Sequence, residues 1–307
     1  MKIRQFGRED LIRIRELDFE AWAGLWSSGS SRRRTMSNLV VNWNDDPQGC
    51  FVAEDRGEFL GYIFSHICGS LGYIGVFGVH PRHRGEGIGK RLLRRSIRHL
   101  KSSGCSTIGL ETRPDNQLNV GLYVRHGFEP KYVTFVLEHS ASDHVAKEKV
   151  VVWDELDESQ QRLVSKKLVV TCNAVMPGLN YVPMALARAQ TSECRICTFN
   201  STNPTGFALV RTAPRFEKED TTDAFVEAMA VKRVSEAKFV GMIRTLETLT
   251  GKWGMKTVSI PVTSFNWHIL ETLVRKEGFR VKRVMLRMLY LEKMVSRNCV
   301  NLNFWAM

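Results

Sequence analysis

The most constraining feature of the sequence is a glycine-rich segment that joins an apolar strand pattern to a helix pattern. Residues 72–79 predict a strand, and Gly85, Gly87 and Gly89 lead into a helix predicted over residues 88–100. Glycines allow positive φ angles and let a ligand approach the backbone, while the free N–H groups at a helix start attract anions. The segment therefore predicts a diphosphate-binding loop, or alternatively a tight turn in which the glycines serve only the backbone geometry.

The spacing of this loop excludes two common nucleotide-binding motifs. The dinucleotide fingerprint G-x-G-x-x-G follows the first strand of its domain, whereas this loop follows the fourth predicted strand. The P-loop requires a Ser or Thr after Gly-Lys to reach Mg²⁺, and here Gly89-Lys90 is followed by Arg91. Neither motif is present.

The order of predicted elements around the loop indicates a mixed sheet flanked by helices. The pattern runs β-α-α-β-β-β-α-β-α-β over about residues 1–139. Strands are predicted near residues 3–6, 50–54, 59–66, 72–79, 107–112 and 132–138, and helices near 11–19, 36–43, 88–100 and 117–126. Hairpin-linked strands followed by two βα crossovers predict an α/β (α+β) fold whose twisted sheet is antiparallel first and parallel later.

The second half of the chain repeats this pattern at an offset of about half the length. Val124-Arg125-His126-Gly127-Phe128 recurs in similar form at residues 274–279, and a repeat of this size indicates a duplicated domain. We expect a first copy over residues 1–142 and a second copy over residues 143–307, with the least regular pattern over residues 138–188.

The second copy lacks the glycines of the loop. At the repeat offset, Ser235, Lys238 and Val240 stand where the first copy has its arginine and two of its glycines. Side chains at these positions occupy the space that a phosphate needs beside bare amides. We therefore expect that the second copy does not bind the anion.

The composition is that of an ordinary globular chain with a basic surface. The 307 residues are 43% hydrophobic with a net charge of +12 spread over both halves, which favours anionic ligands, and each copy is expected to bury its own core. No apolar run approaches the roughly 20 residues that span a bilayer, no signal-peptide pattern opens the chain, and the seven cysteines are an odd number. We expect a cytoplasmic protein without membrane contact. Nucleic-acid binding is not expected, because no aromatic residues interleave with the basic helix.

Two motifs of the first copy together resemble the signatures of the GNAT superfamily of acyl-CoA-dependent N-acetyltransferases. The first is Arg84-Gly85-Glu86-Gly87-Ile88-Gly89 after a strand ending at Val79. The second is Asn116-x-x-Asn119-x-x-Leu122-Tyr123-x-x-x-Gly127-Phe128, in which Asn119 replaces the usual small residue. The resemblance covers about residues 1–139, and the second copy resembles a GNAT fold without its cofactor loop. It implies a GNAT fold duplicated in tandem, acetyl-CoA as co-substrate and an amine as acceptor.

The resemblance also implies a cofactor site. The CoA pyrophosphate would lie on the loop amides, and the pantetheine arm along a strand that Gly75 and Gly78 bend away from its neighbour. The Val79 amide would polarise the thioester carbonyl, and Asn116 would bind the pantetheine or order its own loop. The implied cofactor-binding residues are Phe77, Gly78, Val79, Arg84, Gly85, Glu86, Gly87, Ile88, Gly89, Lys90 and Asn116.

Two residues are implied to move protons. Tyr123 occupies the position from which the family protonates the departing thiolate, and its alternative role is packing on a helix face. Glu111 ends the fifth predicted strand, where a carboxylate could accept the proton of the amine directly or through water. Its alternatives are a strand-end charge or a partner for Arg113. Glu54 and His80 are weaker candidates for the base.

Several questions stay open in the sequence. The acceptor could be a small amine, an aminoglycoside-like compound, a polyamine, or a protein N-terminus or lysine, and the alternative function is a non-catalytic acyl-CoA-binding or regulatory module. The chain is expected to be a monomer with pseudo-dimeric copies, or a homodimer. No metal site is expected, because Cys194 and Cys197 would point to opposite faces of a predicted strand. Residues 31–34, with three arginines, either attract an acidic acceptor or form a mobile solvated loop.

Overall fold

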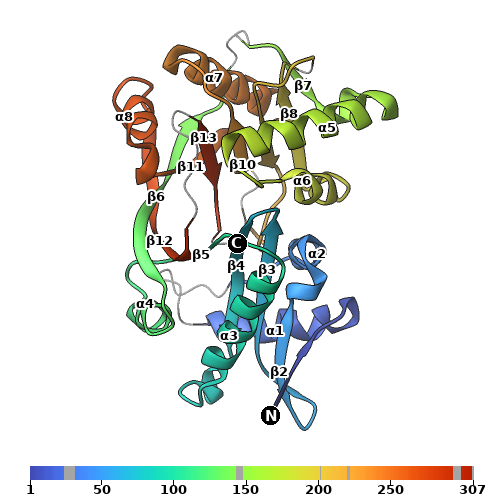
Figure 1. Ribbon diagram of the computed structural model, residues 1–307, viewed down its shortest axis with the longest axis vertical. Helices are drawn as coiled ribbons and strands as arrows, with labels where there is room; N and C mark the ends of the chain where they lie inside the picture. The colour runs from blue at the N-terminus through green and yellow to red at the C-terminus, as the bar shows by residue number, and fades with distance from the viewer. Residues whose placement is uncertain (24–31, 143–147, 201, 220–221, 293–298, 306–307) are drawn as a thin grey trace.

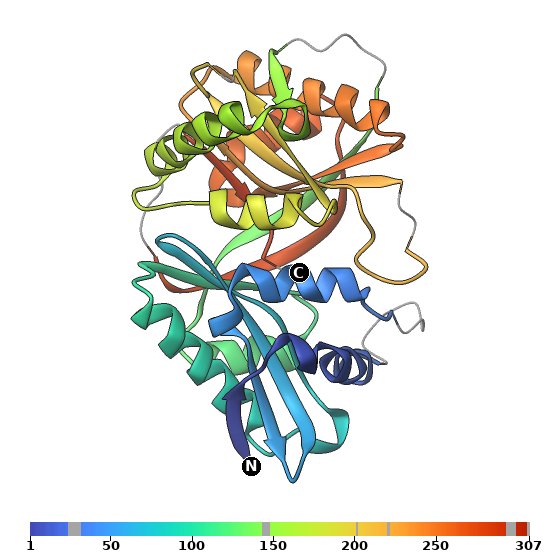
Figure 2. The same cartoon turned by 90° about the vertical axis from the view of Figure 1, so that its right-hand side faces the viewer.

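The computed structural model describes residues 1–23, 32–142, 148–200, 202–219, 222–292 and 299–305. Two lobes, one from each half of the chain, share one twisted sheet with helices on both faces (Figures 1 and 2). The predicted mixed α/β (α+β) fold is confirmed. No helix in the described ranges has the length and apolar character that a membrane crossing requires.

The first half has the predicted order of elements. Apolar alternation and turn residues place each strand within a few residues of its predicted bounds, and the helix after the glycine loop begins at the predicted Ile88. The elements are β1 Lys2–Gln5, α1 Leu11–Trp22, α2 Met36–Asp45, β2 Phe51–Asp55, β3 Glu58–Cys68, β4 Leu71–Val79, α3 Ile88–Ser102, β5 Thr107–Thr112, α4 Gln117–Val124 and β6 Glu129–Ser140.

The second half has the same order of elements, with one additional strand at its end. These are β7 Val150–Val152, α5 Glu158–Val175, α6 Val182–Ala189, β8 Cys194–Phe199, β9 Gly206–Arg211, β10 Asp223–Val231, α7 Glu236–Lys252, β11 Thr257–Thr263, α8 Trp267–Arg275, β12 Arg280–Leu291 and β13 Val300–Asn303. Residues 138–188, where the sequence pattern is least regular, contain β7, α5 and α6. A capping box between Asp157 and Gln160 starts α5, and a buried stripe at helical spacing holds it against the sheet.

The two halves exchange strands. The sheet order is β1-β2-β3-β4-β5-β12-β6-β11-β10-β9-β8-β7, so β12 of the second half pairs with β5 of the first. Reciprocally, β6 of the first half lies between β12 and β11 of the second. These two long strands run from one lobe to the other in Figure 1. The sheet of each lobe therefore contains a strand from the other half of the chain.

The largest hydrophobic core is shared between the halves, whereas two others come almost entirely from one half each, so the expectation of one core per copy is confirmed only in part. The largest buried cluster joins α1, β3 and β4 to α5, α6, β9 and β10 and includes Trp305 from the C-terminal tail. A second cluster under α3 takes in Met288 of β12, and a third under α7 takes in Leu137 of β6. Because each exchanged strand carries core residues into the other lobe, the halves depend on each other for burial.

Cys194 and Cys197 on β8 confirm the expected strand geometry. Cys194 belongs to the large shared cluster and Cys197 to the cluster under α7, on the other face of the sheet. All seven cysteines are free thiols. Among the described residues, no group of three or more possible metal ligands comes together.

Candidate active site

The centre of the candidate site is the point where two parallel strands of the first half part. β4 pairs with β5 only from Leu71↔Thr107 to Ile74↔Leu110, although β4 continues to Val79. Past Ile74, β4 leaves β5 and keeps only its pairing with β3. The expected splay between the fourth and fifth strands is therefore present, and we call the gap in pairing past Ile74 the slot.

A bulge in β4 marks the start of the slot. Gly75 and Val76 together lie opposite the single residue Phe64 of β3, because Ile63 pairs with Phe77 and Ser65 with Ile74. The bulge bends β4 at one of the two glycines expected to bend it. At the other, Gly78, a Cβ would lie 2.8 Å from the Tyr62 ring and 2.9 Å from Ala21 Cβ, so glycine is required there for packing.

The backbone of β4 faces the slot with free polar groups. The His80 amide donates to the Leu60 carbonyl at 2.9 Å, so these two residues form a hydrogen-bonded pair of the antiparallel ladder. Hydrogen-bonded and non-hydrogen-bonded pairs alternate along such a ladder. The pairs Gly61↔Val79 and Ile63↔Phe77 are therefore non-hydrogen-bonded pairs, in which the N–H and C=O groups of β4 point away from β3. Among the described residues, the Phe77 and Val79 backbone thus presents an unpaired strand edge to the slot.

The glycine loop stands at the open end of this edge. Gly85 and Gly87 have φ angles of +89° and +77°, and a Cβ at either would meet no atom within 4 Å. These glycines are therefore needed for the backbone conformation, and the space beside them is open. Gly87 caps α3 without a side-chain hydrogen bond, so the amides of its first turn, from Ile88 to Lys90, stay available to an anion.

Side chains around the loop hold its shape. Nη2 of Arg84 donates to the Ala21 carbonyl at 2.7 Å, which ties the loop to the end of α1. Nδ1 of His83 lies 3.1 Å from Oε1 of Glu86. Gly89 lies inside α3, where a Cβ would be 3.1 Å from the Phe77 ring, so it lets the helix approach β4 closely. Arg84, Glu86 and Gly89 therefore shape the loop, and its bare amides face outward.

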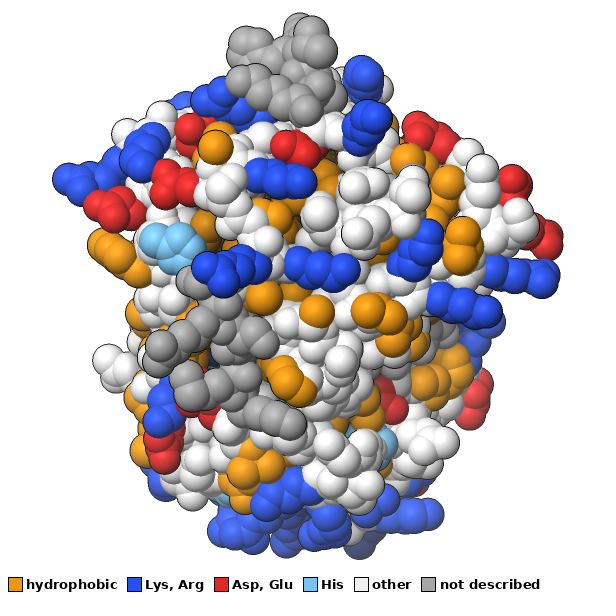
Figure 3. Space-filling view, turned by 45° about the horizontal axis from the view of Figure 1, so that its top comes forward, with side chains coloured by type: hydrophobic (Ala, Val, Ile, Leu, Met, Phe, Trp, Pro, Cys, Tyr) orange, Lys and Arg blue, Asp and Glu red, His pale blue; other side chains and the backbone are white. Residues whose placement is uncertain are grey.

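Basic side chains extend along α3 from the loop. They are all exposed: Lys90, Arg91, Arg94, Arg95, Arg98 and Lys101. Figure 3 shows Lys and Arg side chains gathering along the lower edge of the molecule. A positive field at the start of α3 adds to the helix dipole and favours an anionic ligand at the loop.

Asn116 and Tyr123 belong to α4 beside the slot. The Asn119 amide donates to Oδ1 of Asn116 at 3.2 Å, so Asn116 caps the helix and orders its own loop, one of its two expected roles. Tyr123 is buried in the same cluster as Phe77 and Leu110, which flank the slot, and its ring packs edge-to-face on Phe128. Burial raises the pKa of Tyr123 above its ordinary value, so the phenol stays protonated.

Glu111 is engaged in the contact between the two halves. Its Oε1 accepts hydrogen bonds from Nε and Nη2 of Arg287 on β12 at 2.9 and 2.7 Å, and a further one from the Thr134 hydroxyl. Its Oε2 accepts from the Trp305 amide at 2.9 Å. With both oxygens bound inside a buried ion pair, Glu111 is poorly placed to accept a further proton, and these contacts favour a structural role. Its partner is Arg287, whereas Arg113 pairs with Asp115.

The arginines after the first helix are also structural, which corrects the expectation of a mobile solvated loop for two of them. Arg34 is buried, with Nε 3.3 Å from Oδ1 of Asp18 and Nη1 3.1 Å from Oδ1 of Asn38. Arg33 pairs with Glu16 at 2.5 Å. Ser31 lies outside the described residues. Arg33 and Arg34 therefore fasten α1 to α2 and do not present a free positive surface to an acceptor.

The corresponding slot of the second half is occupied by the chain itself. β10 pairs in parallel with β11 only over Asp223–Phe225, and Ala228–Val231 then pair with β13. β13 thus fills the position that the slot has beside β4. The helix start is closed too, because Oγ of Ser235 accepts from the Lys238 amide at 3.3 Å. The expectation that this copy has lost its anion cradle agrees with both features.

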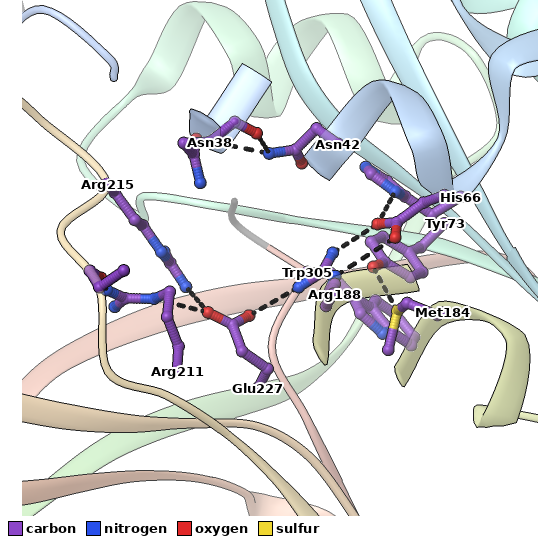
Figure 4. A network of polar contacts seen from close by, with 12 residues as sticks. Asn38, Asn42, His66, Tyr73, Met184, Arg188, Arg211, Arg215, Glu227 and Trp305 are labelled. Atoms are coloured by element: carbon purple, nitrogen blue, oxygen red, sulfur yellow. Dashed lines mark hydrogen bonds and ion pairs between the residues drawn. The ribbon is translucent and has the colours of Figure 1, made fainter. Parts of the chain in front are cut away.

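A buried charge network between the halves escapes sequence reasoning. On β10, Oε1 of Glu227 lies 2.8 Å from both Arg211 Nε and Arg215 Nη2, and its Oε2 lies 3.3 Å from Arg188 Nη1 (Figure 4). Arg188 continues to Asp45 at the end of α2, which also holds His66. The sequence does show a charged residue, Glu227, inside the apolar strand β10. It does not show the partners of Glu227, because these come from other elements.

Comparison with known proteins identifies the family. Residues 11–128 match the model of the Acetyltransferase (GNAT) family. An acetyltransferase of Pectobacterium atrosepticum is 35% identical over 130 residues, which cover 38% of this chain and 86% of that protein. The chain therefore belongs to the GNAT family of acetyltransferases. It is an acyltransferase of the class whose general activity is N-acetyl transfer.

Three further similarities differ in how much of each chain they cover. The mycothiol acetyltransferase of Streptomyces avermitilis is 39% identical over 102 residues, but the match spans only 33% of each chain. The structure of a tandem GNAT protein from the clavulanic acid biosynthesis pathway superposes with a TM-score of 0.58 at 13% identity, over 94% of this chain and 97% of that one. A GCN5-related N-acetyltransferase of Sphaerobacter thermophilus superposes over 100% and 98% with a TM-score of 0.61 at 13% identity. These structures show a common fold over the whole chain, including both halves.

Proposed function

We propose that the first copy transfers an acetyl group from acetyl-CoA to a primary amine within a ternary complex. The observation that carries this proposal is the unpaired edge of β4 at Phe77 and Val79, which leads from the glycine loop to the bulge. Amides of Gly85 to Lys90 would hold the pyrophosphate, and the edge of β4 would pair with the amides of the pantetheine arm. The thioester would then lie near the bulge, where the amine attacks it.

We further propose that the catalytic copy comprises residues 1–142 and the degenerate copy residues 143–307. β13 and Ser235 occupy the places in the second copy that a pantetheine arm and a phosphate would need. The second copy instead supplies β12, and the C-terminal tail that follows it lies beside Glu111 of the first. Because one chain already provides two copies in contact, we propose that the monomer is the functional unit.

The test is cofactor binding followed by turnover. Calorimetric titration with acetyl-CoA should give one site per chain, and free thiol should appear when an amino sugar, a polyamine or a peptide with a free α-amine is added. Binding without thiol release from any amine would favour the alternative of a non-catalytic acyl-CoA-binding module. Absence of acetyl-CoA binding would refute the proposal.

We expect Tyr123→Phe to lower kcat about 100-fold, within the range of general acid catalysis, with little change in acetyl-CoA affinity. The buried phenol stays protonated and can donate to the departing thiolate, whereas phenylalanine keeps the packing on Phe128. Tyr290→Phe is the matched control, because Tyr290 also packs on Phe128 but its hydroxyl bonds Lys101 at the surface. Steady-state thiol release measures both. An unchanged kcat in Tyr123→Phe would leave this residue with a packing role only.

A further inference from the structure

A buried histidine lies beside the point where β4 and β5 part. Nδ1 of His66 on β3 is 3.0 Å from Oδ2 of Asp45, and the ring stacks on Tyr73 with 4.6 Å between the centroids (Figure 4). Burial opposes ionisation of Asp45, but Arg188 and His66 hold the pKa of its carboxyl below the ordinary value. An ionised Asp45 accepts a hydrogen bond from Nδ1–H, which leaves the lone pair of the neutral ring on Nε2.

The other ring nitrogen of His66 has no hydrogen-bond partner among the described residues, although it is buried. It lies against Gly75, where a Cβ would be only 2.3 Å from Nε2. An unsatisfied buried nitrogen costs free energy, so its retention calls for an explanation.

The residue that lies against this nitrogen is partly exposed to solvent. Gly75 is half-buried, while its neighbours Ile74 and Val76 are buried. Gly75 is also the first residue of β4 beyond the pairing with β5, at the inner end of the slot. A side chain at this position would separate Nε2 from the slot, and glycine leaves only backbone between them.

Building on the proposed function, we propose that Nε2 of His66 accepts the proton that the amine loses on attack, through one water molecule at Gly75, with Asp45 orienting the ring. The amine nitrogen forms a bond to the thioester carbon while the carbon–sulfur bond breaks. One proton passes from that nitrogen to Nε2, and Tyr123 supplies one to the sulfur. The products are an amide and a thiol; His66 then releases its added proton to water, and Tyr123 takes one up from water.

The titratable groups that face the imidazole keep their charge near neutral pH. Asp45 comes from α2, Tyr73 from β4 and Arg188 from α6, and Glu227 of β10 pairs with Arg188. The pKa values of Asp45 and Glu227 are lowered, and those of Tyr73 and Arg188 are raised well above their ordinary values. None of these four groups changes its charge between about pH 5 and 8.

The test compares two histidines of the first half. His66→Gln should lower kcat/KM for the best amine of the panel about 100-fold at neutral pH, within the range of general base catalysis. The loss should shrink as the pH rises, because hydroxide replaces the missing base, and the acetyl-CoA affinity should stay unchanged. His99→Gln is the matched control: Nε2 of His99 on α3 pairs with Asp46, which follows α2, at 2.7 Å, and neither residue belongs to the slot.

A measurement on the wild-type protein keeps the inference testable even if His66→Gln does not fold. In ¹⁵N-resolved spectra at neutral pH, His66 should show a protonated Nδ1 and an unprotonated Nε2. The inference would be overturned if the wild type turns over and His66→Gln keeps a rate within threefold of it with an unshifted pH profile. A protonated Nε2 in the neutral ring would also overturn it. Failure of the wild-type protein to acetylate any amine would instead count against the proposed function.

Discussion

Glu227→Gln is expected to lower the free energy of unfolding by about 3–5 kcal/mol, the range found when one partner of a buried ion pair is removed. Glu227 is 2% exposed and receives three arginines, Arg188, Arg211 and Arg215. The neutral amide has the same shape but leaves these guanidinium groups without a counter-charge at the contact between the halves. The uncompensated positive charge is therefore the cause of the expected loss.

Urea denaturation measures this loss through the midpoint at an unchanged slope. Glu236→Gln is the control, because Glu236 pairs with Lys276 on the surface, where solvent screens the pair. We expect the control to denature close to the wild type. A Glu227→Gln midpoint indistinguishable from the wild type would show that the network does not hold the halves together.

The same network predicts how the free energy of unfolding falls at acid pH. Burial opposes ionisation, but the three arginines lower the pKa of Glu227 to about 2, against roughly 4.3 in an unfolded chain. A carboxyl whose pKa is depressed by folding stabilises the protein above the unfolded value, and this contribution is lost as the pH falls from about 4.3 toward 2. The curve of Glu227→Gln should be flatter than the wild-type curve in this window.

The double variant Gly85→Val and Gly87→Val is expected to weaken acetyl-CoA binding about 1,000-fold, as two hydrogen bonds to a charged group at about 2 kcal/mol each would predict. Both glycines have positive φ angles that valine avoids, so the loop would rearrange and its amides would turn away from the pyrophosphate. A Cβ at either position meets no atom within 4 Å, so the rest of the fold should be preserved.

The control for this variant carries the same backbone strain elsewhere. Gly57 and Gly104 have φ angles of +84° and +81°, and a Cβ at either also meets nothing within 4 Å. The variant Gly57→Val and Gly104→Val should lose similar stability while keeping its affinity for acetyl-CoA in calorimetry. Equal affinities in both double variants would contradict the assignment of the pyrophosphate to the loop between residues 85 and 90.

Local patterns predicted the parts of the site that lie close together in the sequence. The glycines at 85, 87 and 89, the strand before them and the helix after them form one continuous unit, whose conformation follows from glycine geometry and apolar periodicity. The helix that carries Tyr123 was found for the same reason. The role of Glu111 could not be judged in this way, because its partners Arg287 and Trp305 are far away in the chain.

The amino-acid sequence by itself determined the strand–loop–helix unit, the order of elements in each half and the loss of the loop in the second half, because each depends on neighbouring residues. The tertiary structure decided the exchange of β6 and β12, the filling of the second slot by β13 and the burial of His66 and Glu227. These features depend on which of several compatible strand edges pair and on charges that meet only after the lobes pack. Such pairings are selected by the burial of the whole molecule, and no local pattern records them.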